Sequence, residues 1–143
     1  MYPCQKAQEL IEKYKTSDPF ELCDNLGIHI IYCDLPKSIE GFFHNIFDEL
    51  IIYVNHNIEE EKIDGVVAHE LGHIVMHSEL NTLFLKENTY LNVNKYEKEA
   101  NIFSAYLIFD KFEFNENIMG LSNFLQVDFD NMAKIAKYKE QYR

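Results

Sequence analysis

Two kinds of spacing between apolar residues predict helices near both ends of this chain and strands between them. Residues 4–15 have helical spacing, and a second helix is expected to begin with the capping sequence Asp18-Pro19 and to stop near Gly27. Three shorter apolar runs are typical of strands: 28–33, 41–47 and 50–54. Because these runs follow one another closely, with a turn at Asp48-Glu49, we expect an antiparallel meander.

The second half of the chain is predicted to be helical. One helix over 63–77 has an apolar side, and further helices are expected over 95–109, near 119–125 and over 128–138. The predicted class is α+β, with a small antiparallel sheet of about three strands packed against the 63–77 helix and further helices at both ends. A chain of 143 residues fits a single domain over 1–143, of which 118–143 form a C-terminal helical part.

The helix over 63–77 contains an HExxH motif, His69-Glu70-Leu71-Gly72-His73. Residues four apart lie one above the other on a helix, so His69 and His73 can hold one metal ion. Glu70 lies about 100° round the helix from His69, where its carboxylate can reach a water molecule at the ion without being a ligand. Two imidazoles and a neighbouring base are what a zinc hydrolase needs. The motif therefore predicts a zinc site on His69 and His73, with Glu70 as the catalytic base.

The motif is short, and an ordinary amphipathic helix with two histidines on its polar face could contain it by chance. The glycines of this helix argue against that alternative. Gly65 and Gly72 lie with Ala68 on a strip of small residues, although a glycine inside a helix costs about 1 kcal/mol relative to alanine. Such a glycine is easiest to explain if another element packs very close to the helix. The helix thus has an apolar face, a polar face with the motif and a strip of small residues. These three faces are more than a surface helix needs, and they favour the metal site.

A catalytic zinc site has three protein ligands, and the third is expected in the next helix. Glu97 and Glu99 are candidates, and because they lie roughly 200° apart round that helix, only one of them can face the metal. Glu97 shares a face with Asn101, which could orient its carboxylate. His77 continues the i, i+4 series of histidines but lies about 12 Å along the axis from the first one. We expect it behind a ligand or at the helix end.

The run HELGHIVMH followed by KYEKEANIFSAYLI resembles the ImmA/IrrE family of zinc metallopeptidases, whose pattern is HELGHxxxH and then ExEAN-x-F. The resemblance extends over nearly the whole chain. It implies a zincin-like fold, one Zn²⁺ per chain, Glu97 as the third ligand and Asn101 beside it. The family often continues with Leu-Leu-Met-Pro, whereas this chain has Leu107-Ile108-Phe109-Asp110. Similar proteins are often encoded on phages and conjugative elements, where they act as antirepressors against a helix-turn-helix repressor.

Composition narrows the range of partners. The net charge of −11 disfavours direct binding to nucleic acid, although 121–135 faintly resembles a helix-turn-helix. No apolar run is long enough for a membrane span. Three widely spaced cysteines, Cys4, Cys23 and Cys33, favour reduced thiols and a cytoplasmic location. An acidic surface suits docking to a basic protein, and simple solubility explains it equally well.

Two functional hypotheses follow. The first is an intracellular zinc metalloprotease that cleaves a helix-turn-helix repressor. The second is a binding module that keeps the zinc-peptidase fold and inactivates a regulator by docking, without hydrolysis. In the enzyme, one further side chain is expected to stabilise the oxyanion, and the sequence does not rank the candidates Tyr90, Tyr106, His44 and His56.

Overall fold

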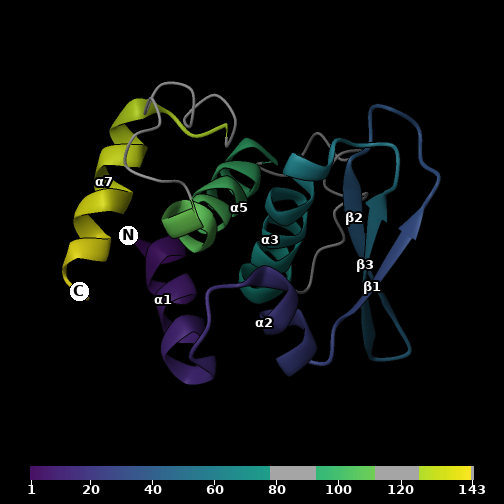
Figure 1. Ribbon diagram of the computed structural model, residues 1–143, viewed down its shortest axis with the longest axis horizontal. Coiled ribbons are helices and arrows are strands. Elements are labelled where there is room, and N and C mark those ends of the chain that lie inside the picture. Colours follow the sequence, from purple (N-terminus) through teal and green to yellow (C-terminus); the bar gives the residue numbers. More distant parts are fainter. Residues whose placement is uncertain (78–92, 112–125, 143) are drawn as a thin grey trace.

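The computed structural model describes residues 1–77, 93–111 and 126–142, in which all helices lie on one side of a small sheet (Figure 1). The elements of the described chain are, in order, α1 (Tyr2–Tyr14), α2 (Pro19–Asn25), β1 (His29–Cys33), β2 (Gly41–Ile46), β3 (Glu49–Asn55), α3 (Glu60–Met76), α5 (Val93–Ile108), the 3-10 turn η1 (Phe109–Lys111) and α7 (Phe129–Glu140). The predicted α+β class with three strands is confirmed. The helix expected near 119–125 lies outside the described residues.

The sheet is mixed, so the expected antiparallel meander is wrong. The strand order is β1-β3-β2, with β3 antiparallel to β2 and parallel to β1. The central place goes to β3, which has a continuous apolar run from Leu50 to Val54 and buries Ile52 and Val54 completely. A strand between two neighbours is covered more fully than an edge strand, and a continuous apolar run is therefore expected at the centre of the sheet. The chain must therefore cross the end of β3 on its way from β1 to β2.

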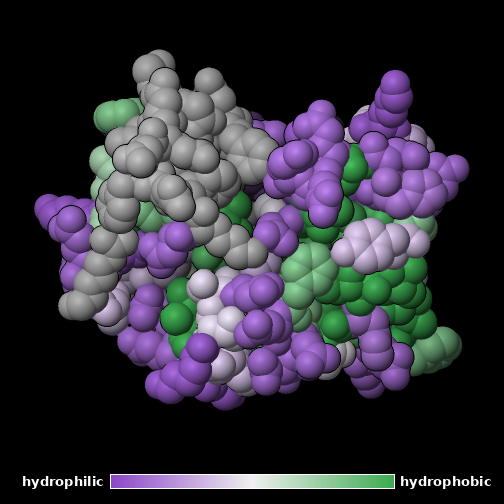
Figure 2. Space-filling model, in the orientation of Figure 1, coloured by the Kyte–Doolittle hydropathy of each residue, from purple (hydrophilic) through white to green (hydrophobic). Residues whose placement is uncertain are grey.

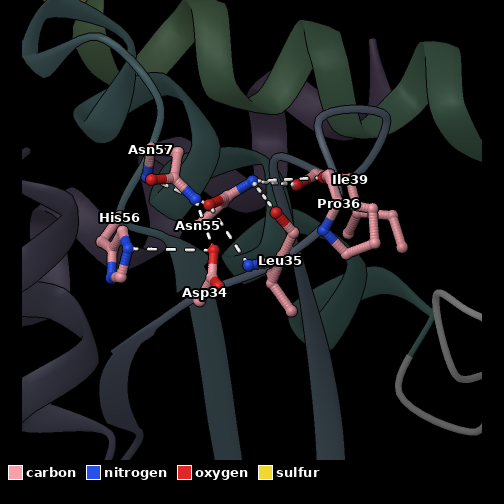
Figure 3. A network of polar contacts seen from close by, with 7 residues as sticks. All are labelled: Asp34, Leu35, Pro36, Ile39, Asn55, His56 and Asn57. Carbon is pink, nitrogen blue, oxygen red and sulfur yellow. Dashed lines mark hydrogen bonds and ion pairs between the residues drawn. The ribbon is translucent and has the colours of Figure 1, made fainter.

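This crossover is held by one buried side chain, that of Asn55, which is 1% exposed. Its amide nitrogen lies 3.1 Å, 3.2 Å and 3.0 Å from the loop carbonyl oxygens of Leu35, Pro36 and Ile39, which share its two N–H groups (Figure 3). Its amide oxygen accepts from the backbone N–H of Leu35 at 3.4 Å and of Asn57 at 3.0 Å. An amide is suited to this place because it donates and accepts at once, so the loop polar groups are satisfied away from the ladder.

The inner face of the sheet packs on α3, with Phe43 buried between them. Gly41 lets β2 approach closely, because a Cβ atom there would lie 2.7 Å from Val66 Cγ1 and 2.8 Å from the carbonyl oxygen of Tyr53. On the outer face, the rings of Phe42 and Tyr53 stack with their centroids 4.7 Å apart. Hydrophobic side chains gather over the strands in the surface view (Figure 2).

The helices α3 and α5 are in close contact. A Cβ atom on Gly72 would lie 2.9 Å from Phe103 Cδ1, which confirms that another element packs tightly against this glycine. Gly65 has more room, since Ile108 Cδ1 lies 3.9 Å from the equivalent position. Nearby, the Ser104 hydroxyl donates to the Gly65 carbonyl at 3.1 Å. The two helices therefore hold a fixed relative position, which sets the geometry between their side chains.

The terminal helices α1 and α7 both lie beside α5 (Figure 1). The hydroxyl of Tyr106 on α5 donates to the Gln8 side chain on α1. On α7, the buried Lys139 places its ammonium 4.0 Å from the centroid of the Tyr106 ring and 3.2 Å from an Asp110 carboxylate oxygen. Asp128 caps α7, accepting from the Asn131 backbone N–H at 2.8 Å. Within the described parts of the chain, no helix is long and apolar enough to cross a membrane.

Candidate metal centre

Helix α3 presents His69, Glu70 and His73 to one region of the interior. The two histidine rings are neighbours, with centroids 4.8 Å apart and planes at 83°, as expected for residues one turn apart. His73 is fully buried and Glu70 is 3% exposed, whereas the His69 side chain keeps 18% of its exposure. Phe43 of β2 stacks on the His73 ring at 6.4 Å. The sheet and α3 therefore hold the inner histidine, while the outer one borders solvent.

Helix α5 brings Glu97 to both histidines. Its two carboxylate oxygens lie 3.0 Å from His69 Nε2 and 3.0 Å from His73 Nε2. One ligand atom from each of the three residues lies within 4.8 Å of the others. The candidate ligands predicted from the sequence are thus brought together from two helices, although 24 residues separate His73 from Glu97.

The charges of this cluster favour a cation. Burial alone would raise the pKa of Glu97, but hydrogen bonds to His69 and His73 lower it well below its ordinary range. Burial alone would lower the pKa of His69, but the hydrogen bond with Glu97 and the nearby Glu70 raise it. An ionised carboxylate therefore faces two imidazoles, and it raises the pKa of His69. When the imidazoles are neutral, their ring nitrogens and the carboxylate oxygens are donors that a divalent cation binds.

The donor set fits zinc. Zn²⁺ binds imidazole nitrogen and carboxylate oxygen at about 2.0–2.2 Å, and a tetrahedral arrangement of such bonds puts neighbouring ligand atoms roughly 3.4 Å apart. The contacts of 3.0 Å from Glu97 to each histidine come close to that spacing. If these three residues held the ion, a fourth position would stay open for water or substrate, as in catalytic sites.

Glu70 lies beside this donor set without belonging to it. Its Oε2 atom is 3.9 Å from His69 Nε2, the nitrogen that faces Glu97. This is the position expected from its place on the helix, one residue after the first histidine. A buried carboxylate at this distance can accept a proton from a water molecule at the fourth position.

Glu99 and His77 make a contact that the sequence did not indicate. Glu99 does not join the three candidate ligands, as its separation from Glu97 implied, but it does not turn away from α3 either. Its Oε1 atom lies 3.3 Å from His77 Nε2. The reason is that His77 ends α3 and packs on the Tyr96 ring at 4.7 Å, beside a face of α5 that a flexible glutamate can reach.

Asn101 lies near His69 as well as on the face of α5 that carries Glu97. The sequence placed it beside Glu97, and in the structure the Asn101 side chain is also among the neighbours that raise the pKa of His69. The periodicity of α5 correctly put Asn101 on the face of Glu97. It could not say which side chain of α3 that face would meet, because this depends on the relative position of the two helices.

The candidates for oxyanion stabilisation fall in several places. Tyr90 lies outside the described residues. Tyr106 is fully buried, with its hydroxyl directed to α1, and His56 lies 3.9 Å from an Asp34 carboxylate oxygen at the far end of β3. Successive residues of a strand face opposite ways, so His44 points to the outer face of the sheet while Phe43 points to α3. The geometry of these described candidates favours structural roles.

Comparison with known proteins agrees with the motif. The family model of the IrrE N-terminal-like domain, a peptidase domain, matches residues 23–138. The chain belongs to the ImmA/IrrE family of metallopeptidases. This confirms the resemblance stated from the sequence.

Two curated relatives were found for this family member. Immunity region protein 2 of Bacillus phage phi105 is 42% identical over 101 residues, which cover 71% of this chain and 64% of the phage protein. Metallopeptidase ImmA of Bacillus subtilis strain 168 is 27% identical over 139 residues, which cover 96% of this chain and 81% of that protein. The chain thus spans less than two thirds of the phage relative's length. No solved structure matches it.

Proposed function

We propose that this chain is a zinc-dependent metallopeptidase, with His69, His73 and Glu97 as the zinc ligands and Glu70 as the general base. One observation carries the proposal: both oxygens of Glu97 approach the two Nε2 atoms of the HExxH histidines at 3.0 Å, and a buried carboxylate lies 3.9 Å from one of them. Two histidines and a glutamate are the ligands of one class of catalytic zinc peptidase. Membership of a metallopeptidase family supports the same chemistry.

Each residue has a defined task in peptide hydrolysis. Zn²⁺, when bound, would supply a Lewis acid that polarises a water molecule and the scissile carbonyl. Glu70 accepts a proton from the water molecule while the oxygen of that water forms a bond to the carbonyl carbon. The same carboxyl group then gives the proton to the nitrogen as the C–N bond breaks, so the base is restored.

The proposed substrate is a protein regulator, specifically a helix-turn-helix repressor of a phage or mobile element. The family resemblance supports this, and so does the printed name of the phage relative, which assigns that protein to an immunity region. The acidic charge of the chain, −11, suits a basic DNA-binding partner better than DNA. Within such a partner, a flexible linker is the expected cleavage point, since a peptidase needs an extended segment.

The test combines metal analysis with cleavage. Wild-type protein should hold about one Zn²⁺ per chain, and His69→Ala should lose it because two remaining ligands bind weakly. Glu70→Gln removes the base but no ligand, so zinc should stay while cleavage of a co-expressed helix-turn-helix repressor falls by several orders of magnitude. Elemental analysis and the appearance of a truncated repressor are the two measurements. Glu61→Ala, on the exposed first turn of α3, is the matched control and should change neither.

Each contrary result has a distinct meaning. Equal zinc content in wild type and His69→Ala would refute the metal site. Undiminished cleavage by Glu70→Gln would refute the assigned base. If the repressor stays full length while its promoter is released, and Glu70→Gln behaves like wild type, the chain works as a docking module.

A further inference from the structure

The inner histidine of the candidate metal centre is bonded on both sides of its ring. His73 Nε2 faces Glu97 Oε1 at 3.0 Å, and its Nδ1 atom lies 3.1 Å from Nδ1 of His77. Beyond it, His77 Nε2 lies 3.3 Å from Glu99 Oε1. Both histidines are buried, with exposed fractions of 0% and 4%. A continuous chain of polar contacts therefore runs from Glu99 through His77 to the inner ligand.

The order of protons along this chain follows from the chemistry of imidazole. A neutral imidazole has one N–H and one lone pair, so two ring nitrogens in contact need a single proton between them. For His73 to give its Nε2 lone pair to a metal, its proton must be on Nδ1, where it is donated to His77. The Nδ1 atom of His77 must then accept. The proton of His77 is left on Nε2, where it is donated to the Glu99 carboxylate.

The opposite placement of the protons prevents His73 from binding a metal through its Nε2 atom. If His77 donated from Nδ1, His73 would accept there and carry its own proton on Nε2, the atom that faces Glu97. A carboxylate at the far end selects between the two orders because an ionised carboxylate only accepts hydrogen bonds. Glu99 thus favours the tautomer of His77 that in turn favours the metal-binding tautomer of His73.

We propose that His77 and Glu99 are positioning residues, which fix the tautomer and ring orientation of His73 through its Nδ1 atom. This inference rests on the proposed zinc site, since it concerns the readiness of one of its ligands. Metal-bound histidines generally donate their second ring N–H to a partner, and removing that partner typically lowers metal affinity 10–100-fold. Here the partner is a second histidine that is itself oriented by a carboxylate. The packing of Tyr96 on His77, at 4.7 Å, keeps that ring in place.

Two substitutions of His77 separate this role from simple packing. In His77→Asn, the side-chain oxygen can take the place of Nδ1 and still accept from His73. In His77→Leu, the volume is kept but the acceptor is lost. We expect Zn²⁺ affinity, measured by chelator competition, to fall about 10–100-fold in His77→Leu and by only a few-fold in His77→Asn. A packing role would instead change the urea midpoint of the metal-free protein and leave the affinities of the folded variants alike.

Glu99 provides a second, milder test because it reaches His73 only through His77. Glu99→Ala should weaken zinc binding about tenfold, whereas Glu99→Gln, which keeps an acceptor oxygen, should weaken it less. Glu61→Ala on the exposed start of α3 is the matched control and should bind zinc like wild type. Nitrogen-15 spectra of zinc-loaded wild type should show the Nδ1–H form of His73 and the Nε2–H form of His77.

The outcomes distinguish this inference from the function on which it rests. If wild type binds zinc and His69→Ala does not, the metal site stands. Unchanged affinity in both His77→Leu and Glu99→Ala, or an Nδ1–H form of His77 in the zinc-loaded protein, would then overturn the positioning role alone. If wild type and His69→Ala bind zinc equally, the metal site itself is refuted.

Discussion

At the scale of single residues, buried and half-buried polar side chains join segments that are far apart in the sequence. Asn55 ties the end of β3 to the crossover loop, Glu97 links α5 to two histidines of α3, and Ser104 bonds to a carbonyl of α3. A polar group away from water is costly unless it is hydrogen-bonded. Each of these side chains therefore fixes the distance between its partners more narrowly than apolar packing would.

Asn55 offers a stability prediction that depends on donor and acceptor chemistry. Asn55→Ala leaves several loop groups without partners and should lower the free energy of unfolding by about 2–3 kcal/mol. Asn55→Asp keeps the shape and the acceptor but loses the amide donor, and its charge would face three carbonyl oxygens. It should destabilise at least as much as the alanine. Urea unfolding of the metal-free protein measures both.

The control for this pair is Asn57→Ala, which removes one exposed hydrogen bond to Asp34. Its effect should stay within about 0.5 kcal/mol. An Asn55→Asp protein as stable as wild type would show that the three carbonyl contacts do not hold the crossover.

At the scale of elements, the sequence pattern predicted individual helices better than the arrangement of helices and strands relative to one another. The helices now labelled α3 and α5 begin within three residues of their predicted starts, because amphipathic spacing is a property of each segment alone. The HExxH residues could be placed together for the same reason, since they share one helix. The strand order could not, because the central place of β3 depends on a loop that a single distant amide secures. Nor could the contact of Glu99 with His77, which depends on how two helices are packed.

The packing of α3 on α5 yields a prediction about the candidate metal centre. In Gly72→Ala the new methyl group would meet Phe103 at 2.9–3.2 Å, so α5 must move or the ring must shift. We expect a loss of about 1–3 kcal/mol in stability, as for overpacked cores. Zinc affinity should also fall, because Glu97 moves with α5. Thermal unfolding and chelator competition are the measurements.

Gly65→Ala is the matched control on the same helix. Its methyl group would lie 3.9 Å from Ile108, an ordinary contact, so the higher helix propensity of alanine should be neutral to stabilising by up to about 1 kcal/mol. Zinc affinity should be unchanged. If the two glycine variants behave alike, close helix packing at Gly72 does not set the geometry of the centre.

At the scale of the whole molecule, the dominant property is charge. The chain has 24 acidic and 13 basic residues, giving a formal net charge of −11. Such a surface repels the phosphates of nucleic acid and attracts positively charged proteins over distances of about 8 Å, the Debye length at physiological ionic strength. A protease directed at a DNA-binding regulator would gain from this field, since the enzyme avoids the DNA and is drawn to the protein that binds it.

The charge therefore predicts how the rate of association with the proposed partner depends on ionic strength. Association of the Glu70→Gln protein with the basic repressor should slow markedly as ionic strength rises, while dissociation changes less, because long-range attraction acts mainly on encounter. Stopped-flow mixing over a salt series measures both rates, and the inactive variant keeps the partner intact. The protein should not retain a labelled DNA duplex at physiological salt. Association rates independent of salt would mean that the acidic surface serves solubility alone, and binding to the duplex would reverse the assignment of a protein partner.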